Sequence, residues 1–225
     1  MTINEQSATD GDRAPDPIVY VVDDEGEVRR SLGFFLKTVG FLPRPYLSGE
    51  DFLSDAADLA PGCVLLDVRL GGISGLDVIE ALGPGRCRLP VIVMTGHGDV
   101  AMAVKSMKLG AIDFLEKPFE EEALVAALKR GFELLAHRAH AEEERRDAER
   151  LMAALSPRER NVLSLLSEGK SNKEVALELD LSVRTVEMHR AAMFDRLSVR
   201  SLPEALRIAF RAGIDLGNGS PALAE

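Results

Sequence analysis

The sequence predicts two domains of different fold class, a doubly wound parallel α/β domain followed by a small all-α domain. Between residues 17 and 137, five short apolar segments alternate with five helical patterns, which is the order expected of a (βα)5 sheet. These apolar segments are continuous rather than alternating, as in strands that are covered by helices on both faces. After residue 156 the strand-like segments stop and short helices follow one another, so we expect the change of fold class there.

The elements of the α/β domain follow from apolar runs and helix-ending residues. Residues 1–16 are polar, acidic and proline-containing, and we expect them to be disordered. The predicted strands are 18–22, 41–47, 63–68, 90–96 and 113–117, of which the second is the weakest. The predicted helices are 27–40, 49–58, 74–82, 99–109 and one from residue 120 onward.

The last of these helices has no clear end. No proline occurs between Phe119 and Ser156, and only Gly131 interrupts the helical pattern. Its apolar stripe fades into the charged segment AEEERRDAER, so we interpret 138–150 as a helical linker, either with a solvated charged face or with a weak coiled-coil seam between two copies.

Serine residues mark the helix starts of the second domain, which we place at 151–213 with a flexible tail at 214–225. Three Ser-x-x-Glu patterns, beginning at Ser156, Ser171 and Ser201, predict capping boxes. Ser182 offers a fourth helix start without the glutamate. The helices from about 171 and 183, joined by the short LDLS, predict a helix-turn-helix.

Charge and composition narrow the function classes. The chain has a net charge of −10, but residues 17–137 hold 12 Lys and Arg against 18 Asp and Glu, whereas residues 150–213 hold 11 against 8. This asymmetry suggests two units with different partners. Cys63 and Cys87 lack metal-ligand or CxxC spacing and are expected to be core thiols. The polar N-terminus is not a signal peptide and no apolar run is long enough to span a membrane, so we expect a cytoplasmic protein with no membrane partner.

Polar residues at the ends of the predicted strands converge on one edge of the sheet, because the carboxyl ends of parallel strands meet there. The first strand ends in Asp23, Asp24 and Glu25, the third in Asp67, the fourth in Thr95 and the fifth in Lys117. Taken alone, each is more often a solvated strand-end residue, and Asp67 could equally be an acid/base group, a nucleophile or a metal ligand. Together, clustered carboxylates favour Mg²⁺, and a lysine and a hydroxyl suit a transferred phosphoryl group. An aspartate beside Mg²⁺ can accept that group.

Three motifs in this region carry a family resemblance. VVDDE (21–25), LLDVRLGGISGLD (65–77) and VMTGHGDVAMAVKSMKLGAIDFLEKPF (93–119) resemble the receiver domain of two-component response regulators, in particular its FixJ-like branch. The resemblance covers residues 18–135 and implies a flavodoxin-like fold. It implies that Asp67 is the phosphoacceptor and that Mg²⁺ is bound by Asp24, Asp67 and the backbone carbonyl of Arg69, with Asp23 acting through water.

The same resemblance assigns the switch. Thr95 would contact the phosphoryl group, Lys117 would pair with it, and Phe114 would turn inward when Thr95 moves.

One departure is that the family usually has proline where this chain has Gly71, followed here by Gly72. Two glycines make the loop after Asp67 more permissive, which bears on how long the phosphate stays. His97 is interpreted as a loop or interface residue rather than a catalytic one.

The second domain resembles the LuxR-type DNA-binding helix-turn-helix, on the motif SNKEVALELDLSVRTVEMHRAAMFDRLSV (171–199). On the helix 183–197, Val186, Met193 and Leu197 should face the core, and His189 is expected to be structural. The opposite face presents Arg184, Glu187, Met188, Ala191 and Asp195 to a major groove. Phosphate contacts are expected from Lys173, Arg184, Thr185 and Arg190.

The family usually has lysine at the position of Glu187. A glutamate there either accepts a hydrogen bond from a cytosine amine or repels phosphates.

These observations predict a phosphorylation-activated transcription regulator, not an enzyme. A sensor histidine kinase would phosphorylate Asp67, and the face of the fourth helix, fifth strand and fifth helix would then dimerise, so that two recognition helices reach promoter DNA. RNA polymerase is a further candidate partner. Two alternatives stay open. The first is a phosphatase with Asp67 as its nucleophile, although such enzymes carry a second aspartate two residues further on, where this chain has Arg69. The second is a regulator that binds DNA without phosphorylation.

Overall fold

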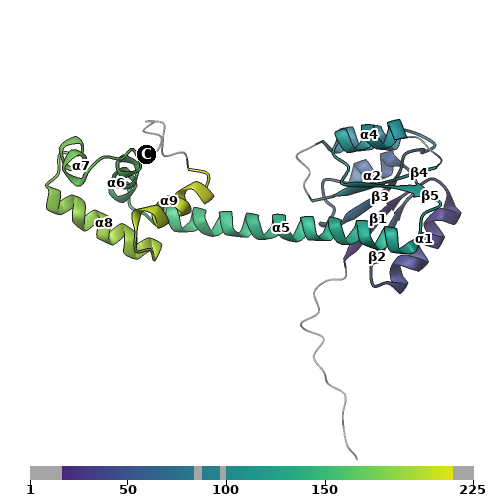
Figure 1. Ribbon diagram of the computed structural model, residues 1–225, viewed down its shortest axis with the longest axis horizontal. Helices are drawn as coiled ribbons and strands as arrows, with labels where there is room; N and C mark the ends of the chain where they lie inside the picture. The colour runs from purple at the N-terminus through teal and green to yellow at the C-terminus, as the bar shows by residue number, and fades with distance from the viewer. Residues whose placement is uncertain (1–16, 84–87, 97–99, 215–225) are drawn as a thin grey trace, which may run out of the picture. The chain divides into compact units, whose positions relative to one another are not determined.

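The computed structural model describes residues 17–83, 88–96 and 100–214 (Figure 1). The expectations of disorder at 1–16 and of a flexible tail from 215 onward, and those made for Cys87 and His97, lie outside the described residues. The chain divides between Arg138 and Ala139 into two compact units, called here the α/β unit and the helical unit.

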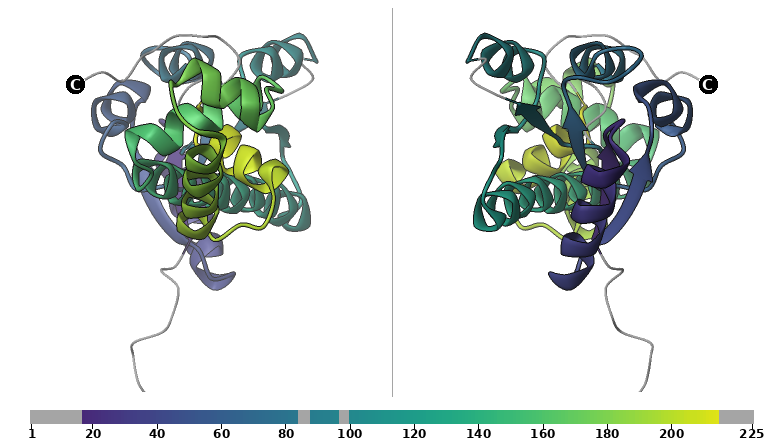
Figure 2. Two further views of the ribbon diagram at one scale, coloured as in Figure 1. Left: turned by 90° about the vertical axis from the view of Figure 1, so that its left-hand side faces the viewer. Right: turned by 90° about the vertical axis from the view of Figure 1, so that its right-hand side faces the viewer.

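The α/β unit contains five strands and five helices in strict alternation, as predicted. The strands are β1 Ile18–Val22, β2 Leu42–Tyr46, β3 Cys63–Asp67, β4 Val91–Gly96 and β5 Asp113–Lys117. The helices are α1 Gly26–Thr38, α2 Gly49–Asp55, α3 Gly75–Leu82, α4 Val100–Lys108 and α5 Glu121–Ala153. All strand pairs are parallel, in the order β2-β1-β3-β4-β5, and helices surround the strands (Figure 2, right). The doubly wound parallel fold is therefore confirmed.

Alternate residues of the central strands face two separate cores, because successive side chains of a strand point to opposite sides. Val21 and Leu65 pack with α1 and α5 on one face. Val22 and Leu66 pack with α2 and α3 on the other. Since both faces are covered, β1 and the first four residues of β3 are apolar, and the carboxylate of Asp67 stands at the last position of β3.

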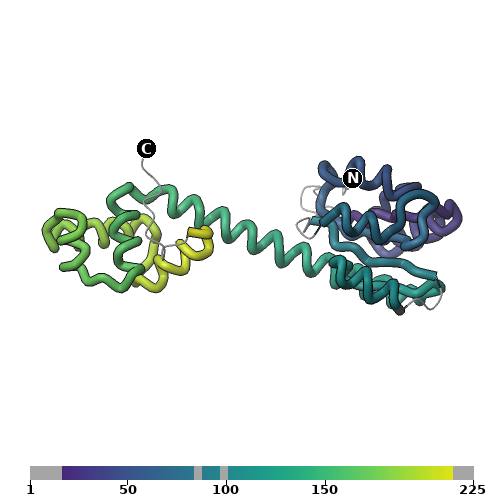
Figure 3. The backbone as a smooth tube through the Cα atoms, turned by 90° about the horizontal axis from the view of Figure 1, so that it is seen from above, coloured from purple at the N-terminus to yellow at the C-terminus, as the bar shows by residue number. Residues whose placement is uncertain are grey.

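Helix α5 is one uninterrupted helix (Figure 3). Its first part is buried in the α/β unit through Leu124 and Leu128, and Met152 near its end lies in the core of the helical unit. Ala148 is also buried, within the segment 138–150 that we had interpreted as a helical linker with either a solvated charged face or a weak coiled-coil seam. Its charged neighbours Asp147, Glu149 and Arg150 are exposed.

The helical unit continues with α6 Pro157–Ser167, α7 Asn172–Glu178, α8 Val183–Leu197 and α9 Leu202–Arg211. Capping boxes form at Ser156 and Ser171, and Ser182 caps α8 by accepting from the Thr185 N–H, as predicted. The box predicted at Ser201 is wrong. Glu204 accepts instead from the Arg200 N–H and the Ser201 hydroxyl, so the serine donates and does not cap the helix.

Candidate functional site

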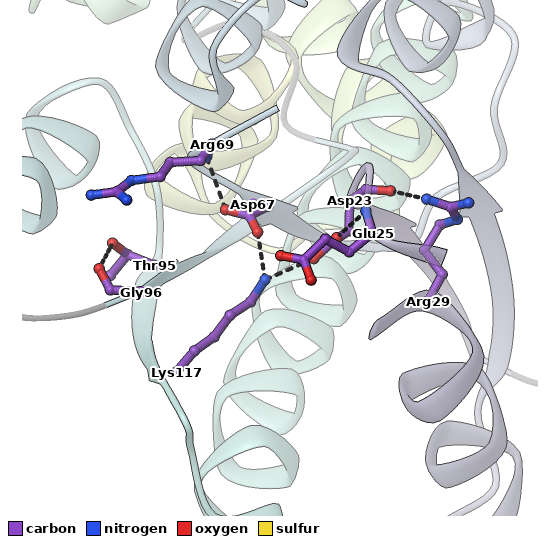
Figure 4. A network of polar contacts seen from close by, with 8 residues as sticks. All are labelled: Asp23, Glu25, Arg29, Asp67, Arg69, Thr95, Gly96 and Lys117. Atoms are coloured by element: carbon purple, nitrogen blue, oxygen red, sulfur yellow. Dashed lines mark hydrogen bonds and ion pairs between the residues drawn. The ribbon is translucent and has the colours of Figure 1, made fainter. Parts of the chain in front are cut away.

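The polar residues at the strand ends lie together at one edge of the sheet (Figure 4). Asp67 is the last residue of β3, Lys117 is the last of β5, and Asp23 follows β1 directly. Asp23 and Asp67 are only 0% and 5% exposed. Two buried carboxylates of the same charge need a compensating cation, since an unpaired buried charge is strongly destabilising.

Lys117 supplies that cation. Its ammonium group donates to Asp23 Oδ2 at 2.7 Å and also to Asp67 Oδ2. The other oxygen of each carboxylate accepts a backbone N–H two residues further along the chain: Asp67 Oδ1 from Arg69 at 2.8 Å and Asp23 Oδ1 from Glu25 at 2.9 Å. The site is thus rigidly hydrogen-bonded around both carboxylates.

The pKa values of the pair reflect competition between burial and pairing. Burial raises the pKa of Asp67 above its ordinary value, and the hydrogen bonds from Lys117 and from the Arg69 N–H oppose this shift without cancelling it. For Lys117, burial alone would lower the pKa, but its hydrogen bonds to Asp23 and Asp67 outweigh burial, so the pKa lies above the usual range. Lys117 is therefore cationic at neutral pH.

Two further residues border the site. Thr95 is buried near the end of β4, and its hydroxyl donates to the Gly96 carbonyl at 3.4 Å, a long contact that leaves the hydroxyl available to another acceptor. Phe114 on β5 is 44% exposed, an unusual position for a phenylalanine in a five-residue strand. Its ring points away from the core in this structure.

The second candidate site is the exposed surface of α7 and α8 in the helical unit. Val186, Met193 and Leu197 are buried, so the predicted core face of α8 is correct. The residues that we expected to contact DNA differ in the exposure of their side chains. Those with exposed side chains are Lys173, Arg184, Glu187, Met188 and Ala191, whereas Thr185 and Arg190 are half-buried. His189 is also half-buried.

Several contacts fix α8 in place. Thr185 shares a hydrogen bond with the Ser182 hydroxyl at 2.8 Å, and the Arg190 guanidinium lies 5.3 Å from the centre of the Phe194 ring. Arg196 Nε donates to the buried Glu159 of α6 at 3.2 Å. We had not predicted the contact between Arg196 and Glu159, because these two residues lie 37 positions apart in sequence.

Comparison with known proteins places both units in established families. Residues 19–129 match the response regulator receiver domain, and residues 153–209 match the luxR family of bacterial regulatory proteins. The transcriptional regulatory protein FixJ of Azorhizobium caulinodans is 43% identical over 196 residues, which cover 87% of this chain and 93% of that protein. FixJ of Rhizobium meliloti is 42% identical over 198 residues, covering 88% and 97%. The chain belongs to the FixJ-like response regulators.

Solved structures agree with this assignment. The structure of the response regulator StyR matches the present chain with a TM-score of 0.73 and 38% sequence identity. The match covers 87% of the present chain and 99% of the StyR chain. Full-length FixJ from B. japonicum matches with a TM-score of 0.55 and 41% identity, over 88% and 97%. The two units are accordingly a receiver domain and a LuxR-type DNA-binding domain, the architecture of a transcription factor. The phosphatase alternative is therefore contradicted.

Receiver domains bind Mg²⁺ at an acidic pocket, and the strand-end carboxylates of this response regulator form one. One oxygen from each of Asp23, Glu25 and Asp67 lies within 4.8 Å of the others. Three carboxylates so placed fit a hard divalent cation that prefers oxygen ligands. Asp24, which we had expected in this group, is exposed like Glu25, and its Oδ2 lies 3.3 Å from the position of a Cβ on Gly71 in the loop after Asp67. Within the described residues, no helix is long and apolar enough to cross a membrane.

Proposed function

We propose that this response regulator is activated when a sensor histidine kinase transfers a phosphoryl group to Asp67. The observation that carries the proposal is the position of Asp67 at the carboxyl end of β3, where the cationic Lys117 bridges it to Asp23. In this step an Asp67 carboxylate oxygen attacks phosphorus, an acyl phosphate bond forms and the bond to the kinase histidine breaks.

The residues around Asp67 have distinct proposed roles. Lys117 pairs with the incoming phosphoryl oxygens, and the Thr95 hydroxyl donates a hydrogen bond to one of them. Asp23, Glu25 or Asp24, Asp67 and the Arg69 carbonyl are the proposed magnesium ligands. When bound, Mg²⁺ offsets the negative charge that the phosphoryl group brings to this acidic pocket.

The proposed output is dimerisation through the face formed by α4, β5 and α5. Val104 and Met107 on α4 and Phe114 on β5 are exposed apolar residues, which suits a surface that becomes covered. We propose that movement of Thr95 and Phe114 changes this face, and that the dimer places two α8 helices on two half-sites of promoter DNA. RNA polymerase is a further partner that this function implies, and the cytoplasm is its compartment.

The contacts proposed for α7 and α8 are phosphate contacts from Lys173, Arg184, Thr185 and Arg190, and base contacts from Glu187, Met188 and Ala191. Exposure of most of these side chains on one surface supports this division.

Incubation of the protein with acetyl phosphate and Mg²⁺ tests the central step. We expect a mass gain of one phosphoryl group, lost in Asp67→Asn, together with a larger dimer fraction and tighter promoter binding. A mass gain that persists in Asp67→Asn would refute the assignment of Asp67. Equal DNA affinity with and without phosphorylation would instead favour the constitutive regulator.

A further inference from the structure

The loop that follows Asp67 is closed tightly at its base. The Gly75 N–H donates to the Val68 carbonyl at 3.0 Å, and a Cβ on Gly75 would lie 2.2 Å from the Asp67 carbonyl oxygen. The far end of the loop is fixed by a capping box, in which Ser74 and Asp77 bind each other's backbone N–H. Between these anchors, the Arg69 N–H donates to Asp67, and Leu70 and Ile73 pack against the apolar core.

Glu50, in the first turn of α2, binds the backbone of this loop at Ile73, directly before Ser74. Its Oε1 accepts the Ile73 N–H at 2.9 Å, a contact between residues 23 positions apart. This backbone hydrogen bond is also the main reason why the pKa of Glu50 lies below its usual value.

Gly72 lies next to the Glu50 carboxylate, where a side chain on residue 72 would meet it. A Cβ on Gly72 would lie 2.3 Å from Glu50 Oε1 and 2.9 Å from Glu50 Oε2, so alanine here requires the Glu50 carboxylate to move. The Glu50 side chain is exposed and flexible enough to do so, but the movement would break its hydrogen bond with the Ile73 N–H. Glu50 and Gly72 therefore form a matched pair, the Glu50 clamp.

The clamped loop borders the acidic pocket. A Cβ on Gly71, next to Gly72, would lie 3.3 Å from Asp24 Oδ2, and the Arg69 N–H at the start of the loop donates to Asp67. Displacement of Gly72 and Ile73 would therefore change the position of Gly71 against Asp24 and of the Arg69 backbone against Asp67. This chain has Gly71 where the family usually has proline, so the loop lacks the fixed φ of a proline at that position, and the hydrogen bond that Glu50 accepts from Ile73 is a restraint two residues further along.

We propose that Glu50 is a positioning residue for the phosphorylation site, which acts by fixing the loop 69–73 over the acidic pocket. This inference rests on the proposed role of Asp67. A purely structural role for Glu50, as an acidic residue near the positive end of the α2 dipole, would be shared by Asp51 in the same turn. The two residues thus offer a matched comparison.

The test uses the full-length protein and the variants Glu50→Ala, Glu50→Gln, Asp51→Ala, Gly72→Ala and the double variant Glu50→Ala/Gly72→Ala. The first measurement is hydrogen–deuterium exchange of the peptide that contains residues 69–74, without metal. The second is the Mg²⁺ concentration that gives half the maximal rate of Asp67 phosphorylation by acetyl phosphate.

We expect Glu50→Ala to raise exchange in this peptide and to raise the Mg²⁺ requirement about threefold to tenfold, as loss of one hydrogen bond would. Glu50→Gln should restore both values because its amide oxygen can still accept from Ile73, and Asp51→Ala should change neither. Gly72→Ala should resemble Glu50→Ala when made alone and add little in the double variant, because the atom that it displaces is already gone.

Two results would overturn the Glu50 clamp: equal exchange and equal Mg²⁺ requirement in Glu50→Ala and Asp51→Ala, or additive effects of Glu50→Ala and Gly72→Ala. Failure of the wild-type protein to become phosphorylated at Asp67 would refute the proposed function instead, while the exchange measurement would still decide whether the clamp exists.

Discussion

Gly131, the residue that interrupts the predicted fifth helix, lies against β3 in the structure. A Cβ at this position would lie 2.5 Å from the sulfur of Cys63 and 3.2 Å from Ile112 Cδ1. Cys63 is fully buried, so its sulfur has little room to move. We therefore expect Gly131→Ala to force α5 away from the sheet or to push the sulfur into its neighbours.

The magnitude follows from two opposing effects. Alanine is favoured over glycine inside a helix by about 1 kcal/mol, and overpacking of a core costs about 1–3 kcal/mol. Gly131→Ala should therefore lower the free energy of unfolding by about 1 kcal/mol. In a Cys63→Ala background the nearest remaining atom of residue 63 is Cβ at 3.8 Å, an ordinary contact. The approach to Ile112 Cδ1 at 3.2 Å remains and requires a small movement of that flexible side chain, so the same substitution should instead stabilise the domain by up to about 1 kcal/mol, a coupling of up to about 2 kcal/mol.

Urea unfolding followed by tyrosine fluorescence measures this cycle in the full-length protein. The chain has two tyrosines and no tryptophan, and Tyr20 and Tyr46 both lie in the receiver domain, so the signal reports on that domain. Additive effects of Gly131→Ala and Cys63→Ala, or a gain in stability from Gly131→Ala alone, would refute the assignment of this glycine to a close helix–strand contact.

Three further predictions follow from contacts described above. Lys117→Ala leaves two buried carboxylates unpaired and should lower the free energy of unfolding without metal by about 3 kcal/mol, part of which Mg²⁺ restores; equal denaturation midpoints with and without Mg²⁺ would contradict this. Burial raises the pKa of Cys63 to about 12. Since the unfolded thiol ionises at a lower pH, stability should fall as pH rises above about 8.5, and the folded thiol at pH 8 should resist alkylation, detected by peptide mass spectrometry. Lys173→Ala should weaken binding to all DNA and reduce the salt slope by about one, whereas Met188→Ala should change sequence preference; unchanged slope and preference would show that α8 is not the recognition helix.

The sequence predicted the sheet well because each buried strand is a continuous apolar run. Strand β5 was predicted without error at its bounds, and β3 within one residue. The edge of the sheet that holds the acidic residues was predictable for the same reason, since parallel strands bring their carboxyl ends together whatever the loops do. The sequence did not predict that Glu25 also lies near this cluster: Asp24 and Glu25 are adjacent in sequence, and the turn into α1 brings an oxygen of Glu25 within 4.8 Å of Asp23 and Asp67.

Contacts between distant segments left no periodic signal to detect. The Glu50 clamp joins residues 23 positions apart, and the pair of Glu159 and Arg196 joins two helices. Gly131 illustrates the opposite difficulty, because its signal was present but ambiguous. In sequence it weakens a helix, whereas in the structure it allows that helix to approach the sheet. Local pattern showed that glycine was unusual there, but only packing gives the reason.

The bridge that Lys117 makes between Asp23 and Asp67 has a consequence for supply of the metal. Because Lys117 already compensates the charge of Asp23 and Asp67, the folded receiver domain carries its own internal counter-ion, and we expect it to keep its fold without magnesium. Scarcity of magnesium would thus slow the passage of a signal through the regulator while leaving the stock of folded regulator intact.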